Sequence, residues 1–306
     1  MTTGEIRFDG RVAVVTGAGG GLGRAHALLL AARGAQVVVN DLGGTLNGSG
    51  GDDAAANRVV AEIRAAGGQA VANHDSVASP EGARRLVQQA VDEYGRLDVL
   101  INNAGILRDK SLAKMAPGDF EAVIAVHLLG SAYCSQAALS QMQGQAYGRI
   151  VMTTSAAGLY GNFGQTNYGA AKLGLVGLMN SLKLECGKYG IHINTVAPVA
   201  LTRMTEGLPL AQLIGDAAPE QVSAAVAFLA SEACRFSGEV VAAGAGYLAR
   251  VQIVESMGVH LARDTLSPEA VAAAWPQIAD MAGARPFGSA TEALIGAFGG
   301  VVAQAS

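Results

Sequence analysis

The chain has 306 residues, half of them apolar, which is enough for a substantial buried core in one large domain or two. Its net charge of only −4, without a run of Lys or Arg, argues against a nucleic-acid partner. Residues 1–10 contain no apolar run, and no later apolar run reaches the roughly 20 residues of a spanning helix, so we expect neither a signal peptide nor a membrane protein.

Short apolar strands alternate with longer helical patterns along most of the chain. The expected strands are Arg11–Thr16, Gln36–Asn40, Gln69–Asn73, Val99–Asn102, Arg149–Thr153, Ile191–Ala197 and Glu239–Ala243. The expected helices are Leu22–Arg33, Asp52–Ala66, Pro80–Tyr94, Pro117–Met142, Asn167–Tyr189 and Pro219–Ala230. This alternation predicts an α/β fold, a doubly wound parallel Rossmann-type sheet of seven strands with helices on both faces.

The alternation stops after Gly246, and the remaining chain is rich in alanine. We therefore expect one sheet domain over residues 1–249 and a helical extension over residues 250–306. In the extension, Ser267-Pro268-Glu269 is typical of a helix start, and a second helix is expected over Thr291–Gln304. The extension is expected to pack on the same domain or on a neighbouring subunit.

A glycine-rich sequence, Thr16-Gly-Ala-Gly-Gly-Gly-Leu-Gly23, follows the first strand and begins the first helix. Glycines there permit a tight turn and close approach to a pyrophosphate, while the helix N-terminus offers free N–H groups. We expect the cofactor to contact Gly17, Gly20, Gly21, Leu22 and Gly23. A flexible turn without a ligand is the alternative.

Asp41 ends the second strand, about 20 residues past the glycines, where a carboxylate can accept hydrogen bonds from ribose hydroxyls. The same charge repels a 2′-phosphate, and no Lys or Arg lies nearby in residues 18–20 or 40–44 to bind one. The pattern favours NAD over NADP. A purely structural Asp41 that starts a turn is the alternative.

Tyr168 and Lys172 are four residues apart, so on a helix they lie on one face. An ammonium beside a phenol favours the phenolate and lowers the tyrosine pKa, which makes the tyrosine a usable general base. Ser155 follows the fifth strand, at the edge where open α/β sheets place their ligands. Its hydroxyl is expected to hold the substrate oxygen.

These motifs, together with Asn102-Asn-Ala-Gly105, resemble the short-chain dehydrogenase/reductase family over residues 11–246. The resemblance implies that Ser155 positions the carbonyl, that Tyr168 is the acid/base, and that Lys172 binds the nicotinamide ribose. It also implies a set of further cofactor contacts: Asp75 beside the adenine, with Ser76 and Val77, then Asn103, Ala104, Gly105 and Pro198.

His127 stands where the family usually has an asparagine that holds a water for proton relay from the lysine. The residue is thus a candidate catalytic group, and a satisfied buried histidine is the equal alternative.

A closer resemblance lies in stretches that the general family does not share. They are Val39-Asn-Asp-Leu-Gly-Gly44, Asn103-Ala-Gly-Ile-Leu-Arg-Asp109, Val126-His-Leu-Leu-Gly130, Tyr160-Gly-Asn-Phe-Gly-Gln165, Arg203-Met-Thr205 and Gly244-Ala-Gly246. Together with the helical tail, they are similar to the (3R)-hydroxyacyl-CoA dehydrogenase module of the peroxisomal multifunctional enzymes of type 2, a module also known for 17β-hydroxysteroid activity, and to its bacterial stand-alone relatives.

This resemblance implies NAD-dependent oxidation of (3R)-3-hydroxyacyl-CoA to 3-oxoacyl-CoA. A 17β-hydroxysteroid or steroid-CoA dehydrogenase and a 3-oxoacyl-carrier-protein reductase are alternatives within the enzyme class. A non-catalytic NAD sensor is the alternative from another class. The family's use of long helices in subunit contacts implies a homodimer or homotetramer, and a separate enoyl-CoA hydratase is a possible partner.

The expected setting is the cytoplasm. Three widely separated cysteines argue against a disulfide framework, and the final residues do not match a Ser-Lys-Leu peroxisomal address. The five histidines show no i, i+4 pairing or clustering with cysteine, so we expect no metal site.

Overall fold

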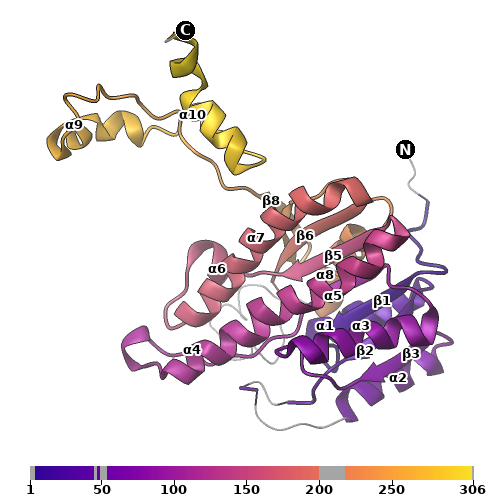
Figure 1. Cartoon of the computed structure of the whole chain (residues 1–306). Helices are drawn as coiled ribbons and strands as arrows, with labels where there is room; N and C mark the ends of the chain where they lie inside the picture. The colour runs from indigo at the N-terminus through magenta and orange to yellow at the C-terminus, as the bar shows by residue number, and fades with distance from the viewer. Residues whose placement is uncertain (1–3, 45–46, 49–53, 200–217, 305–306) are drawn as a thin grey trace. The chain divides into compact units, whose positions relative to one another are not determined.

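The computed structural model describes residues 4–44, 47–48, 54–199 and 218–304, with side chains to residue 298. The chain divides into two compact units, Met1–Arg250 and Val251–Ser306. The first unit is a sheet with helices on both faces, and the second contains two helices (Figure 1). Arg203-Met-Thr205, one stretch of the closer resemblance, lies outside the described residues.

The sheet runs in the order β3-β2-β1-β4-β5-β6-β7-β8. Its strands are β1 Val12–Thr16, β2 Gln36–Asn40, β3 Gln69–Asn73, β4 Val99–Asn102, β5 Gly148–Thr153, β6 Ile191–Pro198, β7 Val240–Gly244 and β8 Tyr247–Val251. Every pairing from β3 to β7 is parallel. The parallel, doubly wound architecture expected from the sequence is therefore confirmed.

The sheet has one strand more than the seven expected. Only Ala245 and Gly246 separate β8 from β7, and both have positive φ angles, 49° and 76°. Two left-handed residues in succession form the tight turn that joins antiparallel strands. The pattern of β8 gave no signal because its side chains are mostly exposed at the edge of the sheet and lack the continuous apolar character of the buried strands.

The first unit contains long helices in two layers and several short helical segments. They are α1 Gly21–Ala32, α2 Ala54–Ala65, α3 Pro80–Tyr94, η1 Leu112–Lys114, α4 Pro117–Ile124, η2 Ala125–Leu129, α5 Gly130–Gln145, α6 Ala156–Tyr160, α7 Thr166–Cys186, η3 Gly187–Tyr189 and α8 Pro219–Ala230. Helices α1, α2 and α8 cover one face of the sheet, and α3, α5 and α7 cover the other.

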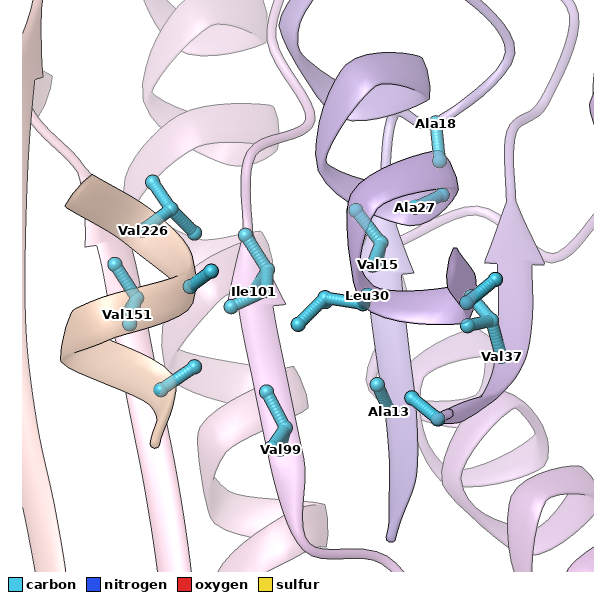
Figure 2. Close-up of a cluster of buried hydrophobic side chains, with 14 of the residues drawn as sticks. Ala13, Val15, Ala18, Ala27, Leu30, Val37, Val99, Ile101, Val151 and Val226 are labelled. Atoms are coloured by element: carbon cyan, nitrogen blue, oxygen red, sulfur yellow. The ribbon is translucent and has the colours of Figure 1, made fainter. Parts of the chain in front are cut away.

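A core cluster lies between the sheet and helices α1, α2 and α8, and Figure 2 shows part of it. Leu30 of α1 and Val226 of α8 point toward strand residues such as Val15 and Ile101, all of them at most 1% exposed. Because parallel strands buried on both faces need apolar side chains in both directions, these strands are nearly continuous runs of Val, Ile and Ala.

The long helix expected over Pro117–Met142 is not uniform, since Ala125–Leu129 forms a π-helical turn between α4 and α5. The continuous helical segment Pro117–Gln145 has 29 residues, and by length and composition it is long and apolar enough to cross a membrane, contrary to our expectation for any segment. Its α5 part packs against α3 and α7, and one such helix is weak evidence for a membrane span.

The second unit contains α9 Pro268–Ile278 and α10 Ala290–Gln304. The helix start expected at Ser267-Pro268 is present: the Ser267 side chain accepts a hydrogen bond from the N–H of Ala270, 3.1 Å long, and Pro268 fills the first turn. The expected packing of this extension on the same domain or a neighbouring subunit stays a prediction.

The start of β4 is joined to β1 by a buried carboxylate. Asp98 accepts a hydrogen bond from the N–H of Val12 (3.0 Å) and forms ion pairs with Arg11 (2.8 Å) and Arg96 (2.7 Å), while its own side chain has no exposed surface. Only the carboxylate of this cluster is fully buried, so its charge depends on these partners, and breaking such a buried pair is costly.

We expect Asp98→Asn to lower the free energy of unfolding by about 3 kcal/mol. Urea unfolding followed by circular dichroism measures the change. The matched control is Glu62→Gln, which removes an exposed ion pair with Arg24 and is expected to cost less than about 1 kcal/mol. Equal losses in the two variants would contradict the role given to Asp98.

Candidate active site

The predicted site residues lie at one edge of the sheet, where β1, β4, β5 and β6 end. The strand order reverses between β1 and β4, and open α/β sheets bind ligands outside the strand ends at such a point. The glycine loop follows β1, Asn103 follows β4, and Ser155 follows β5. Pro198 is the last residue of β6 and is half-buried.

The glycine loop makes a close backbone contact with the segment after β4. Gly17 has a φ of 63°, and a Cβ atom there would lie 2.7 Å from the Cα of Ala104. A Cβ at Gly23 would lie 2.3 Å from the carbonyl oxygen of Gly17. Both positions therefore require glycine, and the loop has the tight form that a dinucleotide turn needs.

The first helix begins without a side-chain cap. Gly20 is its N-cap residue, and Gly21, the first helical residue, has a φ of 53°. The N–H groups at the start of α1 are thus left for a ligand, and their dipole favours an anion such as a pyrophosphate. Leu22 follows in the first turn and packs against the core cluster.

Asn103 fastens this loop to β4. Its side-chain amide donates to the carbonyl oxygens of Thr16 (2.9 Å) and Gly17 (3.1 Å), and its backbone N–H donates to the hydroxyl of Thr16 (3.0 Å). The N–H of Ala104 donates to the same hydroxyl at 3.0 Å. The amide of Asn103 therefore fixes the loop's backbone, and the support of the cofactor that sequence similarity implied for this residue stays a prediction.

Asp41 lies beside the glycine loop. One carboxylate oxygen accepts from the N–H of Gly19 (2.8 Å), and the other accepts from the N–H of Gly43 (2.7 Å). The carboxylate therefore shapes both its own turn and the loop, so the structural alternative and the ribose-binding role are compatible. Its position against Gly19 brings a negative charge to the place where we expect the adenosine ribose.

The other expected adenine contacts follow β3. Asp75 forms an ion pair with Arg85 (2.6 Å) and accepts a hydrogen bond from the side-chain amide of Asn73 (2.9 Å). Ser76 directs its carbonyl oxygen toward Gly82 of α3, and Val77 is buried against Gly130 of α5. The loop is thus positioned by both helices, and its contact with adenine stays a prediction.

Ser155, Tyr168 and Lys172 are brought together by β5, α6 and α7. The Ser155 hydroxyl caps α6 by accepting from the N–H of Ala157 at 3.1 Å, and its side chain lies close to that of Tyr168. Lys172 is buried one turn after Tyr168, with its Nζ 5.4 Å from the centre of the tyrosine ring. Its ammonium donates to the carbonyl oxygen of Thr153, 2.6 Å away.

Burial dominates the electrostatics of this group. It raises the pKa of Tyr168, and the nearby Ser155 hydroxyl only partly opposes that shift. It also lowers the pKa of Lys172 to about 7. The expected lowering of the tyrosine pKa by Lys172 is not visible in this structure, and for the cofactor-bound enzyme it stays a prediction.

His127 lies on the π-helical turn and reaches the same site. Its ring meets the Tyr168 ring edge-on, 5.2 Å between centres, and its Nε2 lies 2.8 Å from the Ile106 carbonyl oxygen and 3.0 Å from the Ile106 N–H nitrogen. The ring also fills the space beside Gly105, where a Cβ would be 2.3 Å away.

Among the residues that the structure describes, none forms a hydrogen bond with the buried Nδ1 of His127. Burial, together with the charge of Lys172, lowers the pKa of the ring. The ring is therefore neutral, and Nδ1 is free to bond to a water or a ligand. This favours the relay role over a fully satisfied buried histidine, but participation in proton transfer stays a prediction.

Asn167 is a site residue that the sequence reasoning missed. It is fully buried, its side-chain oxygen accepts from the N–H of Tyr168 (2.7 Å), and its amide donates to the carbonyl oxygen of Arg108 (3.1 Å). It fixes the first turn of α7 and so the direction of Tyr168. The only available signal was an amide directly before the tyrosine.

Comparison with known proteins agrees with this geometry. The family model for short chain dehydrogenase matches residues 11–212, which include the glycine loop, Asn103, Ser155, Tyr168 and Lys172. The chain belongs to the short-chain dehydrogenase family. It is therefore an oxidoreductase of that family, as the sequence motifs indicated.

Two relatives resemble the chain closely. The peroxisomal multifunctional enzyme type 2 of Mus musculus is 49% identical over 281 residues, 91% of this chain but 38% of that protein. A short-chain type dehydrogenase/reductase of Mycobacterium tuberculosis is 50% identical over 275 residues, 90% of this chain and 96% of that protein. The chain thus spans well under half of the multifunctional relative and nearly all of the bacterial one.

Two solved structures share the fold. The full-length peroxisomal multifunctional enzyme type 2 of Drosophila melanogaster superposes with a TM-score of 0.81 and 40% identity, over 98% of this chain and 50% of that one. A 7α-hydroxysteroid dehydrogenase complexed with NADH superposes with a TM-score of 0.71 and 29% identity, over 78% of this chain and 95% of that one. Family membership and this neighbour indicate a nicotinamide dinucleotide cofactor.

The glycine loop gives a direct test of the cofactor site. We expect Gly17→Ala to weaken NADH binding at least tenfold, because the new methyl group pushes the loop away from Ala104 and strains a residue with positive φ. Nucleotide fluorescence titration measures the dissociation constant. Gly177→Ala, in open space on α7, is the matched control and should bind NADH normally. Normal binding by the Gly17 variant would exclude this loop as the site.

Proposed function

We propose that this chain is an NAD-dependent dehydrogenase that oxidises the hydroxyl of a (3R)-3-hydroxyacyl-CoA to the ketone. The observation that carries the proposal is the placement of the Ser155 hydroxyl beside Tyr168 and the buried Lys172, at the strand edge that holds the glycine loop. The substrate class is supported by the similarity to multifunctional enzymes of type 2 over 91% of the chain.

The residues divide the work as follows. The Ser155 hydroxyl donates to the substrate oxygen, and the Tyr168 oxygen takes the hydroxyl proton. The Lys172 ammonium stabilises the phenolate that must exist before that transfer, since its charge lies one helical turn away. The nicotinamide, when bound, supplies the acceptor for the hydride that leaves the carbon bearing the substrate hydroxyl.

The surroundings of this group are partly apolar. Tyr168 packs against a small apolar cluster that contains Ile106, Val123 and Ala171. In such surroundings charge interactions are stronger than in water, so the same burial that raises the tyrosine pKa increases the effect of a nearby ammonium. We infer that the charge of Lys172 lowers the raised pKa of Tyr168 only when a ligand completes the site.

We expect Tyr168→Phe to lower kcat by on the order of 10²–10⁴-fold, because it removes the group that takes the proton but keeps the ring. NADH binding should change less than about twofold. Steady-state assays with NAD and a panel of straight-chain, branched and steroid-side-chain 3-hydroxyacyl-CoAs, together with free hydroxysteroids, measure both substrate choice and the loss.

Tyr189→Phe, at the far end of α7, is the matched control for this variant. Near-normal turnover by the Tyr168 variant would contradict the acid/base assignment. If the wild-type chain turns over none of these substrates, the result favours a non-catalytic NAD sensor over an enzyme. A clear preference for free steroids would replace the acyl-CoA substrate by the steroid alternative.

Asp41 predicts the choice of cofactor. The wild-type chain should prefer NAD, and Asp41→Asn, which keeps an oxygen to accept the Gly19 N–H but removes the charge, should reduce the NAD/NADP ratio of kcat/KM about tenfold. Parallel assays with both cofactors measure the ratio. Asp92→Asn on α3 is the control. A wild-type preference for NADP would favour the carrier-protein reductase alternative.

A further inference from the structure

An exposed apolar surface lies next to the catalytic group. Leu112 is 62% exposed, Tyr160 is 74% exposed and Phe163 is 91% exposed. These side chains belong to two segments, Lys110–Lys114 after β4 and Tyr160–Gly164 between α6 and α7, which together we call the rim. Exposed apolar side chains that gather into one patch, unlike single ones, are typical of a binding region.

Hydrogen bonds hold the two segments of the rim side by side. The N–H of Lys110 donates to the carbonyl oxygen of Gly164 at 2.8 Å, and Lys110 and Gln165 form a parallel β-bridge. The side-chain amide of Gln165 donates to Asp109 at 2.7 Å. The rim is therefore one structure, and its apolar side chains are carried on a fixed backbone.

The rim is joined directly to the catalytic residues. The chain enters it from Ser155 through α6 and leaves it at the first turn of α7, where Tyr168 lies. Asn167 bonds both to Tyr168 and to the carbonyl oxygen of Arg108, which precedes the rim. Figure 1 shows α6 and the start of α7 at the same end of the unit as α4. A substrate bound at Ser155 and Tyr168 can thus extend over the rim.

The rim also offers unpaired positive charge. Lys110 and Lys114 are both exposed, and neither side chain forms an ion pair with any residue in the described part of the chain. Of the neighbouring carboxylates, Asp119 is paired with Arg108 at 3.1 Å, whereas Asp109 accepts a hydrogen bond from the neutral amide of Gln165 and keeps its charge. Two ammonium groups beside exposed apolar and aromatic side chains match a ligand that carries phosphates, a flexible chain and a base.

We propose that the rim binds the coenzyme A part of the substrate: Lys110 and Lys114 bind its phosphates, and Leu112, Tyr160 and Phe163 contact its pantetheine chain and adenine. This inference rests on the proposed function, because only a thioester of coenzyme A carries such a group beyond the reacting carbon. The acyl chain, the secondary alcohol and NAD occupy the site already described.

The test compares a substrate that has the phosphates with one that lacks them. For the Lys110→Gln/Lys114→Gln double variant, we expect KM for a 3-hydroxyacyl-CoA to rise about fivefold to tenfold while kcat changes little. KM for the matching 3-hydroxyacyl pantetheine thioester, which has no phosphate, should stay within about twofold of the wild-type value. The wild-type KM for the CoA substrate should also rise between about 0.05 M and about 0.5 M salt, and more steeply than that of the variant.

Lys188→Gln, an exposed lysine at the opposite end of α7, is the matched control and should change neither KM. Wild-type protein with the same KM for both thioesters, or a double variant that raises both equally, would overturn the rim as a phosphate site while leaving the dehydrogenase assignment intact.

Calorimetric titration with free coenzyme A and with pantetheine separates this inference from the proposed function. The wild-type chain should bind coenzyme A more tightly than pantetheine, and the double variant should lose that difference. If no hydroxyacyl thioester is oxidised but this binding difference is present and is lost in the variant, the rim stands and the proposed reaction fails. Equal binding of the two compounds by the wild-type chain would overturn the rim.

Discussion

The contact between the glycine loop and the backbone after β4 is the constraint on which the rest of the site depends. Gly17 approaches Ala104 so closely that no side chain fits between them, and Asn103 and Thr16 hold the two segments together with hydrogen bonds. This contact sets the position of the helix N-terminus where the cofactor is expected. The same contact fixes the start of the segment after β4. That segment passes Ile106, whose carbonyl oxygen lies against His127, and then enters the rim.

The second organising feature is the burial of charge-bearing groups beside the reacting centre. Lys172, Tyr168 and His127 all lie in surroundings that disfavour their charged forms. Such a site is poorly prepared for proton transfer by itself, because neither a phenolate nor an imidazolium is stabilised there. The burial makes each added charge or hydrogen bond more effective, so ligand binding and proton transfer are coupled physically.

In this arrangement the reacting residues and the exposed rim lie in different segments of the chain. Residues at the strand ends and the first turn of α7 carry the chemistry shared by a large family, whereas the segments Lys110–Lys114 and Tyr160–Gly164 present exposed apolar and basic side chains to solvent. Since these segments are held by backbone hydrogen bonds, their side chains can vary without disturbing Tyr168. This is where substrate choice can diverge while the reaction stays the same.

The sequence by itself determined the features that depend on local pattern. The alternation of strands and helices, the glycine loop after β1 and the spacing of Tyr168 and Lys172 are all set by residues close in the chain, so periodicity and turn chemistry revealed them. The start of α9 at Ser267 was found for the same reason. Similarity of motifs then assigned their roles.

Only the tertiary structure decided the features that depend on contacts between distant segments. The edge strand β8 is exposed and has no apolar pattern, and the π-helical turn that carries His127 leaves no mark in the helix's periodicity. The bond from Lys172 to the carbonyl of Thr153 and the raised pKa of Tyr168 follow from burial, which the packing of β5 against α7 creates. Burial and long-range hydrogen bonds are properties of the assembled fold, and no local pattern encodes them.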